Sequence, residues 1–97
     1  MKYKLDYIST FHMDVWQVTD SLKEYPQKAV RIFSRLDKIL GLLVDMPEMY
    51  PVYEPFPMFR KITIEDYAAF YTINEETKLI EVHRLLYGRM DMPRRMI

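Results

Sequence analysis

Six side chains in the second half of the chain could take part in phosphoryl chemistry: Arg60, Lys61, His83, Arg84, Tyr87 and Arg89. A ribonuclease that works without a metal ion needs a base for the 2′-hydroxyl, an acid for the leaving oxygen, and cations for the charge that develops on the phosphate. His, Tyr, Lys and Arg can supply these functions. His83 and Arg84 are adjacent on an expected strand, so they point to opposite faces and cannot both serve one site.

The two histidines do not indicate a metal site. A single histidine on a strand, such as His83, is more often a structural residue than a catalytic one. His12 lies on an expected helix and has no partner at metal-ligand spacing. We therefore predict no metal and no cofactor.

A basic stripe, defined by Lys28, Arg31, Arg35 and Lys38, runs along an expected helix at positions i, i+3, i+7 and i+10. One interpretation is a solvated face whose repulsion is relieved by Asp37. The alternative is a contact surface for an acidic partner. The sequence leaves both open.

The elements that must position these residues come from two halves of the chain. Residues 58–91 predict three strands joined by the short turns Glu65-Asp66 and Asn74 to Thr77, and loops this short join antiparallel neighbours. The runs are rich in β-branched and aromatic residues. Three strands are near the lower limit of independent stability, so one face needs a second layer.

The first half supplies that layer. Residues 3–7 alternate in the period of a strand, and the spacing of Phe11, Val15, Val18 and Leu22 predicts a helix that Ser9 or Thr10 caps. Asp14 is expected in its first turn, where a negative charge suits the helix dipole. A second helix is predicted from Pro26 to about Val44, antiparallel to the first. Gly41 inside it suggests a close contact with a neighbouring element.

Residues 45–57 form a loop with four prolines and the aromatic residues Tyr50, Tyr53 and Phe56. Extended backbone is expected there. The aromatic residues either pack the loop onto the domain or contact a partner.

The middle strand has two distinct faces. Tyr67, Ala69, Tyr71 and Ile73 share one face, and we expect the helices over them. Ala68, Phe70 and Thr72 share the other face, and no remaining segment is expected to cover it. An apolar patch of this kind predicts a partner.

Composition describes one ordinary globular domain, residues 1–97, with 49% hydrophobic and 29% charged residues. The absence of cysteine, of a signal-peptide pattern and of a long apolar run leads us to expect a cytoplasmic protein that does not enter a membrane. Fourteen basic residues balance fourteen acidic ones, which argues against tight nonspecific binding of nucleic acid.

Three stretches carry a resemblance to a known family: Arg60-x-Ile62-x-Ile64, then Asp66-Tyr67-x-x-Phe70-Tyr71-x-Ile73, then Ile80-x-Val82-x-Arg84-Leu85-Leu86-Tyr87-Gly88-Arg89-x-Asp91. Together they resemble the C-terminal half of the RelE/ParE toxins of type II toxin–antitoxin systems. The resemblance implies an α+β fold of order β-α-α-β-β-β, in which a helical hairpin packs on one face of an antiparallel sheet. It also places the first strand beside the last, at the edge.

The resemblance is closer to the ParE-like branch. The ribonuclease branch usually has Arg where this chain has Ala68, and it tends to have Tyr or His near its C-terminus, whereas residues 92–97 contain neither. Arg89 matches the arginine after the last strand. ParE-like members are thought to act by binding DNA gyrase, so the resemblance implies a toxin that binds a large target.

Three hypotheses follow from the resemblance. The first is a ParE-like toxin that a cognate antitoxin neutralises. The second is a RelE-like, ribosome-dependent mRNA endonuclease that uses Arg60, Tyr87 and Arg89. The third is a degenerate toxin that retains only antitoxin binding. Partners would be the antitoxin and either gyrase or the ribosome with its mRNA, in a homodimer or a toxin–antitoxin heterotetramer. Antitoxin or target contacts are expected at Ala68, Phe70, Thr72, Lys28, Arg31, Arg35 and Lys38.

Overall fold

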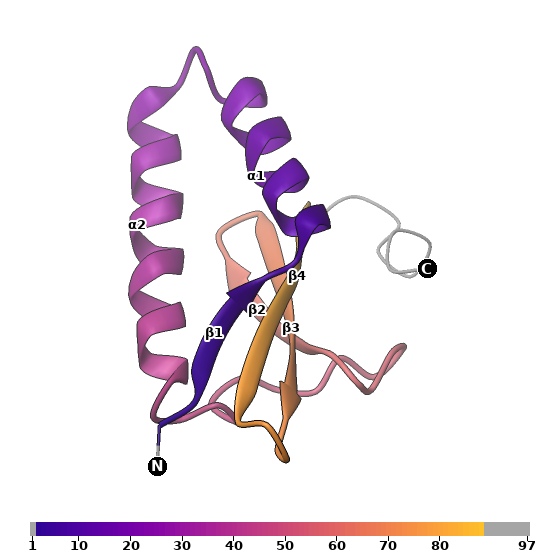
Figure 1. The fold of residues 1–97 in the computed structure, drawn as a ribbon. Helices are drawn as coiled ribbons and strands as arrows, with labels where there is room; N and C mark the ends of the chain where they lie inside the picture. The colour runs from indigo at the N-terminus through magenta and orange to yellow at the C-terminus, as the bar shows by residue number, and fades with distance from the viewer. Residues whose placement is uncertain (1, 89–97) are drawn as a thin grey trace.

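A computed structural model describes residues 2–88 and shows a pair of helices packed on a four-stranded sheet (Figure 1). The elements occur in the predicted β-α-α-β-β-β order, which confirms the α+β fold class. They are β1 (Lys4–Tyr7), α1 (Ser9–Ser21), α2 (Pro26–Leu43), β2 (Arg60–Ile64), β3 (Tyr67–Asn74) and β4 (Leu79–Tyr87).

The strand order is β1-β4-β3-β2, so the first strand does lie beside the last at an edge. The turns make β2, β3 and β4 antiparallel, as expected. β1, however, is parallel to β4, and the sheet is mixed rather than wholly antiparallel. The antiparallel helices return the chain to the end of the sheet where β1 begins (Figure 1). β2 and β4 therefore run in the same direction as β1.

The two helices cover the face of the sheet that the sequence predicts. Their buried side chains form one cluster with Tyr67, Ala69 and Tyr71 of β3, while Ile73 is partly buried against it. The helical contributions are Phe11, Val18, Leu22, Ile32, Leu36, Leu40 and Leu43. None of the helices within residues 2–88 is both long and apolar enough to cross a membrane. The expected close contact at Gly41 is wrong, because no atom of residues 2–88 lies within 4 Å of a Cβ placed there.

The first helix is attached along the edge of β4, beyond the end of β1. The Ile8 N–H donates to the Val82 carbonyl at 3.0 Å, and the Thr10 hydroxyl donates to the His83 carbonyl at 2.8 Å. The Leu85 N–H donates to Asp14 Oδ2 at 3.0 Å. The cap predicted at Ser9 or Thr10 is wrong, since Ile8 precedes the helix and Thr10 binds β4 instead. Asp14 is likewise not in the first turn but buried.

The segment between α2 and β2 runs around the β2 edge from one face of the sheet to the other. On the helix side the Tyr71 hydroxyl donates to the Pro47 carbonyl at 2.6 Å, and Arg60 Nη1 donates to the Tyr50 carbonyl at 2.8 Å. At the edge the Lys61 N–H donates to the Pro51 carbonyl at 3.0 Å. In Figure 1 the segment then extends past β3 on the side away from α2.

This segment covers the face that we expected to be bare. Phe59, Ala68, Phe70 and Leu86 form a second buried cluster, with Tyr53 and Phe56 packed against it. Ala68 is 2% exposed and Phe70 is 0% exposed, so the predicted apolar patch is wrong at both positions. The prediction failed because the covering segment has no periodicity. Of the two interpretations of the loop aromatics, packing onto the domain is confirmed for Tyr53 and Phe56.

Candidate functional site

The structure does not bring Arg60 and Tyr87 together. Arg60 begins β2 opposite Tyr71, whereas Tyr87 ends β4 opposite Tyr67. Four residues along β3 separate these two levels, which is about 13 Å. The Arg60 guanidinium is occupied by the Tyr50 carbonyl. Arg89, the third member of the predicted catalytic set, lies outside the described residues.

His83 lies on the loop-covered face and is engaged on both sides. Its Nε2 is 3.0 Å from the Thr72 hydroxyl, and its ring meets Phe59 edge to face with centroids 5.1 Å apart. Burial lowers the pKa of His83 below its usual range. These contacts favour a neutral, structural histidine. Thr72, a predicted contact residue, is partly exposed at the rim of this face.

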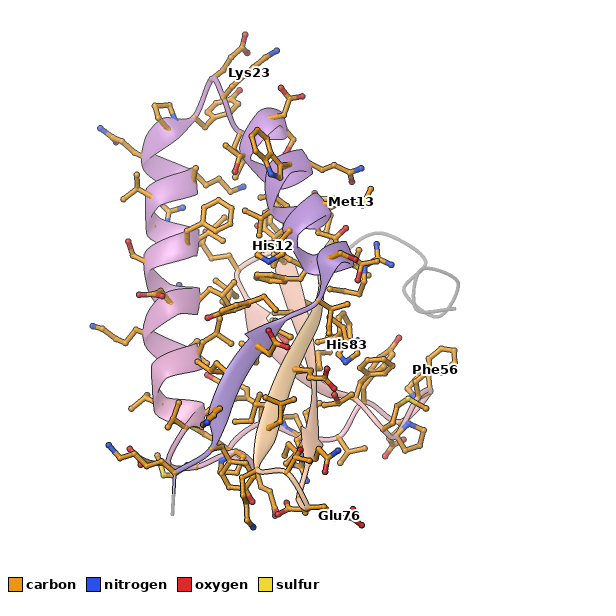
Figure 2. The ribbon with its side chains drawn as sticks, viewed as in Figure 1. His12, Met13, Lys23, Phe56, Glu76 and His83 are labelled. Atoms are coloured by element: carbon orange, nitrogen blue, oxygen red, sulfur yellow. The ribbon has the colours of Figure 1, made fainter. Side chains whose placement is uncertain are left out.

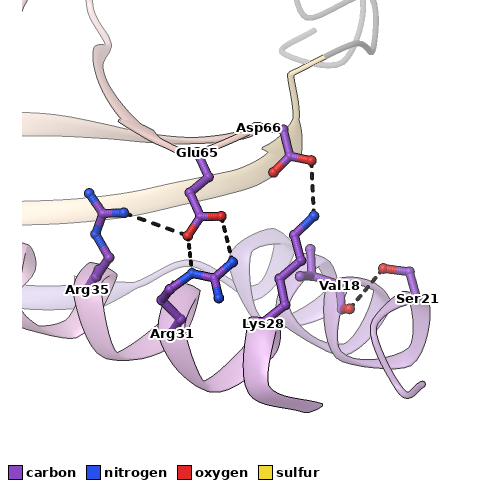
Figure 3. A network of polar contacts seen from close by, with 7 residues as sticks. All are labelled: Val18, Ser21, Lys28, Arg31, Arg35, Glu65 and Asp66. Atoms are coloured by element: carbon purple, nitrogen blue, oxygen red, sulfur yellow. Dashed lines mark hydrogen bonds and ion pairs between the residues drawn. The ribbon is translucent and has the colours of Figure 1, made fainter. Parts of the chain in front are cut away.

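The basic stripe contacts carboxylates of its own chain, at the β2–β3 turn (Figure 3). Arg31 binds Glu65 through two bonds, Nε to Oε2 at 2.6 Å and Nη2 to Oε1 at 2.9 Å. Arg35 Nη1 is 3.7 Å from the same carboxylate, and Lys28 Nζ is 3.2 Å from Asp66 Oδ2. The carboxylates that compensate positive charge on the basic stripe therefore come from this turn, which is distant in sequence. That pairing could not be predicted from helical spacing.

The turn itself is held in a defined conformation. Glu65 has a φ of 54°, in the left-handed region. The Gly88 N–H donates to the Asp66 carbonyl at 2.6 Å, and a Cβ on Gly88 would lie 2.9 Å from that oxygen. Only glycine therefore allows the end of β4 to approach the turn this closely. Hydrogen bonding from Arg31 lowers the pKa of Glu65, and Glu65 in turn raises the pKa of Arg31.

A cleft of about 500 Å³ lies between α1 and this end of the sheet. One of its lining residues is Asp14, which is 5% exposed and accepts bonds from Arg84 Nε at 2.7 Å and Nη2 at 3.1 Å. Its other lining residues include Lys28, Asp66 and Tyr87. The Asp14–Arg84 ion pair was not among the sequence-based predictions. The signal was the position of Asp14, three residues after Phe11 and four before Val18, on the buried face of the helix.

A second groove, of about 510 Å³, lies between the two helices beside β1. Its walls carry Tyr7, Phe11, His12 and Phe33, and the rings of Tyr7 and Phe11 are stacked with centroids 5.5 Å apart. Figure 2 shows His12 on α1 directed toward the space between the helices. Burial raises the pKa of Tyr7. The groove is largely apolar, and it can accept apolar side chains of another polypeptide.

Residues 16–92 match the model of the family described as the ParE toxin of the type II toxin–antitoxin system parDE. The chain belongs to this ParE toxin family. No curated protein sequence matches it significantly.

Three solved structures share the fold of this ParE-family chain. The chromosomal ParDE system of P. aeruginosa matches with a TM-score of 0.70 and 16% identity, over 89% of this chain and 96% of that one. RelBE2 of Mycobacterium tuberculosis gives 0.65 and 15%, over 90% and 99%. The isolated RelE toxin of E. coli gives 0.65 and 18%, over 97% and 94%. The predicted RelE/ParE resemblance is confirmed, and at these identities the structures show a shared fold alone.

Ala68 packs in the interior of this ParE-family chain. The resemblance placed an arginine of the ribonuclease branch at this position. In this ParE-family chain the residue is a buried alanine in the loop-covered cluster. It has neither the charge nor the exposure that contact with a phosphate requires.

Proposed function

We propose that this ParE-family toxin acts by binding a large protein target, for which DNA gyrase is the candidate, and does not cleave RNA. The observation that carries the proposal is the separation of the candidate catalytic groups. Arg60 is bound to a loop carbonyl about 13 Å along the sheet from Tyr87, and His83 is bonded to Thr72. General acid–base catalysis needs its groups within hydrogen-bonding reach of one substrate.

A cognate antitoxin is the second proposed partner, and the cytoplasm is the proposed location. The similar structures from M. tuberculosis and P. aeruginosa are of toxin–antitoxin systems, and a variant of E. coli RelE has been solved with a peptide of the antitoxin RelB. For this chain we propose that an antitoxin segment places apolar side chains in the groove between α1 and α2 and contacts the basic stripe. On the far face, Thr72 is the accessible member of the predicted set, since Ala68 and Phe70 are covered.

The decisive experiment combines two assays on the purified protein. We expect inhibition of gyrase supercoiling and no cleavage of ribosome-bound mRNA. Cleavage of mRNA that disappears in Arg89→Ala or Tyr87→Phe would overturn the proposal in favour of the RelE-like endonuclease. One observation supports that second candidate: Tyr87 lines a cleft that also contains Lys28 and Arg84.

Expression without the antitoxin tests the third hypothesis. We expect growth arrest that co-expression of the antitoxin relieves. A harmless protein that still binds the antitoxin would instead identify a degenerate toxin. Light scattering of the free protein and of the complex distinguishes a homodimer from a toxin–antitoxin heterotetramer.

A further inference from the structure

β1 forms one edge of the sheet, and the centre of its outer side has no partner (Figure 1). Its inner side pairs with β4, where the Lys4 N–H donates to the Lys78 carbonyl at 2.9 Å. Successive residues of a strand direct their backbone groups to alternate sides, so those of Leu5 point away from β4. Within residues 2–88 the Leu5 N–H and carbonyl make no hydrogen bond. An edge with open backbone groups is a template for pairing with another strand.

The backbone N–H groups on either side of Leu5 along this edge are already occupied. The Tyr3 N–H donates to the Val44 carbonyl, at the end of α2, at 3.0 Å. The Tyr7 N–H donates to Asp6 Oδ1, also at 3.0 Å. These bonds leave an open stretch of three residues, Lys4-Leu5-Asp6. A strand that pairs here must therefore be centred on Leu5.

The charges beside Leu5 lie on the face of the sheet away from the helices. Leu5 packs against the helix-side cluster, so Lys4 and Asp6, which are exposed, point the other way. Asp6 is opposite Glu81 of β4 in the strand register. Neither carboxylate has a lysine or arginine within ion-pair distance among residues 2–88, and Lys4 has no carboxylate partner in the same part of the chain. The edge thus presents one cation and a pair of carboxylates that lack counterions.

The stretch Lys4-Leu5-Asp6 is complementary to itself in an antiparallel pairing. Leu5 opposite Leu5 of a second copy makes a hydrogen-bonded pair, in which each N–H donates to the other carbonyl. Lys4 of each copy then lies opposite Asp6 of the other, in the non-hydrogen-bonded pairs where side chains are closest. A register shifted by two residues would bring lysine to lysine or aspartate to aspartate, and like charges directly opposite repel. The charges therefore select one register.

We infer that two copies of this protein pair through β1 with twofold symmetry, joined by the backbone of Leu5 and by two Lys4–Asp6 ion pairs. The inference goes beyond the proposed function and does not rest on it. Lys4 of the second copy also supplies the missing counterion beside Asp6 and Glu81. Because the chain has no net charge, long-range repulsion does not oppose association of two copies.

The dimer is expected to be weak and to leave the opposite edge of the sheet accessible. A contact of a few residues on each side is far smaller than a standard protein interface, so association should be reversible. β1 and β2 are the two edges of the sheet, and the basic stripe contacts the β2–β3 turn. A second copy on β1 therefore does not compete with a partner that binds the stripe.

Sedimentation equilibrium of the full-length protein at low salt tests the inference. We expect the average mass to rise from that of a monomer toward that of a dimer between about 10 µM and about 1 mM, the range of weak complexes. Lys4→Asp or Asp6→Lys alone should weaken association at least about tenfold, because two attractive pairs become two repulsive pairs. An equimolar mixture of the two variants should restore it, since both cross-strand pairs are then attractive.

Two exposed residues near the connection between the helices provide charge-matched controls. Figure 2 shows Lys23 at the tip of the helical pair, and Asp20 lies close by in α1. Lys23→Asp and Asp20→Lys change the net charge as the edge variants do and should leave association unchanged, alone or mixed. Trp16 is a competing contact site, since it is 78% exposed on α1. Trp16→Ser should also have little effect.

Disulfide trapping tests the register, because the chain has no cysteine of its own. In the inferred pairing the Cα atoms of Lys4 and of Asp6 in the second copy are about 4.5 Å apart, within the range of a disulfide. The same position in the two copies is related diagonally, at about 7–8 Å, which is too far. A mixture of Lys4→Cys and Asp6→Cys should therefore cross-link several-fold faster than either variant alone.

Four results would overturn the inference. The first is a protein that stays monomeric throughout the concentration range. The second is a mixture of Lys4→Asp and Asp6→Lys that associates no better than each variant alone. The third is an equal loss of association in the controls or in Trp16→Ser, which would place the contact elsewhere. The fourth is cross-linking of one cysteine variant by itself as fast as the mixture, which would exclude the inferred register.

Discussion

The two faces of the sheet are closed in different ways. Two periodic helices cover one face and build a broad buried cluster with the sheet, along with the buried carboxylate of Asp14. An irregular, proline-rich segment covers the other face, where the buried cluster consists of Phe59, Ala68, Phe70 and Leu86. The comparison shows that a few aromatic side chains can close a sheet face without a regular element. Because Ala68 and Phe70 are covered, the part of the predicted contact set that stays accessible on this face is Thr72, at its rim.

The largest effect is expected from Phe70→Ala on the loop-covered face. Phe70 is fully buried and meets the Tyr53 ring edge to face with centroids 5.0 Å apart. Loss of a buried phenylalanine side chain costs about 3–5 kcal/mol when a cavity remains. Urea unfolding should show that loss. Phe56→Ala is the matched control, since the half-buried Phe56 should cost clearly less. Equal, small losses would mean that the loop covers this face only loosely.

A somewhat smaller effect is expected from Asp14→Asn on the helix face. The substitution removes the charge of the carboxylate that Arg84 contacts and weakens the acceptor for the Leu85 N–H. Breaking a buried ion pair on one side costs about 3 kcal/mol. Asp20→Asn, on an exposed position of the same helix, should change the unfolding free energy by less than about 0.5 kcal/mol. If the two variants proved equally stable, the Asp14 carboxylate would contribute little to holding α1 on the sheet.

A gain in stability is expected from Gly41→Ala on the outer side of α2. Gly41 lies inside the helix, and a Cβ there meets nothing within 4 Å in the part of the chain that the structure describes. Alanine should therefore add about 1 kcal/mol through helix propensity. Thermal unfolding measures the gain. A loss of antitoxin binding in this variant would show that a partner approaches the helix backbone at this position.

The smallest effect is expected from the titration of His83. Burial lowers its pKa in the folded protein, so the unfolded chain binds the proton first as the pH falls through about 6.5. Stability should decrease from that pH down to the lowered folded value. The slope should be shallower in His83→Gln.

Glu65 and Glu75 affect stability at a lower pH than His83 does, so their contribution to the stability profile can be distinguished from that of His83. Hydrogen bonds from Arg31 and Tyr3 lower the pKa of Glu65 and of Glu75, respectively. Their contribution to stability is present above about pH 4.3 and is lost as the pH falls through the folded values. A stability profile that His83→Gln leaves unchanged between pH 7 and about 5 would contradict the assignment to His83.

Most of the fold could be predicted because it depends on local periodicity. The helix faces, the two turns and the inward set of β3 all follow from spacings of two or of three and four residues. The direction of β1 could not be predicted in this way, since it depends on where a long segment returns the chain. The cover over Ala68 and Phe70 could not either, because residues 45–57 have no period, although their aromatic residues were a usable signal.

The candidate site was harder to predict because its contacts are long-range. The stripe on α2 was visible in the sequence, but its carboxylates come from a turn more than thirty residues further along the chain, for example Glu65, which is 34 residues from Arg31. The separation of Arg60 from Tyr87 follows only from the strand register. Asp14 lay on an apolar helical face, and its partner Arg84 is 70 residues away.

The attachment of α1 to β4 has a consequence for how copies of this protein behave at high concentration. β4 extends beyond the end of its neighbour β1. A strand edge with unsatisfied backbone groups is a template on which other chains can polymerise. Here the hydroxyl of Thr10 and the carboxylate of Asp14 occupy those groups. Two polar side chains of α1 thus protect the exposed edge of β4 from pairing with other chains. Substitution of Thr10 or Asp14 is therefore expected to promote aggregation.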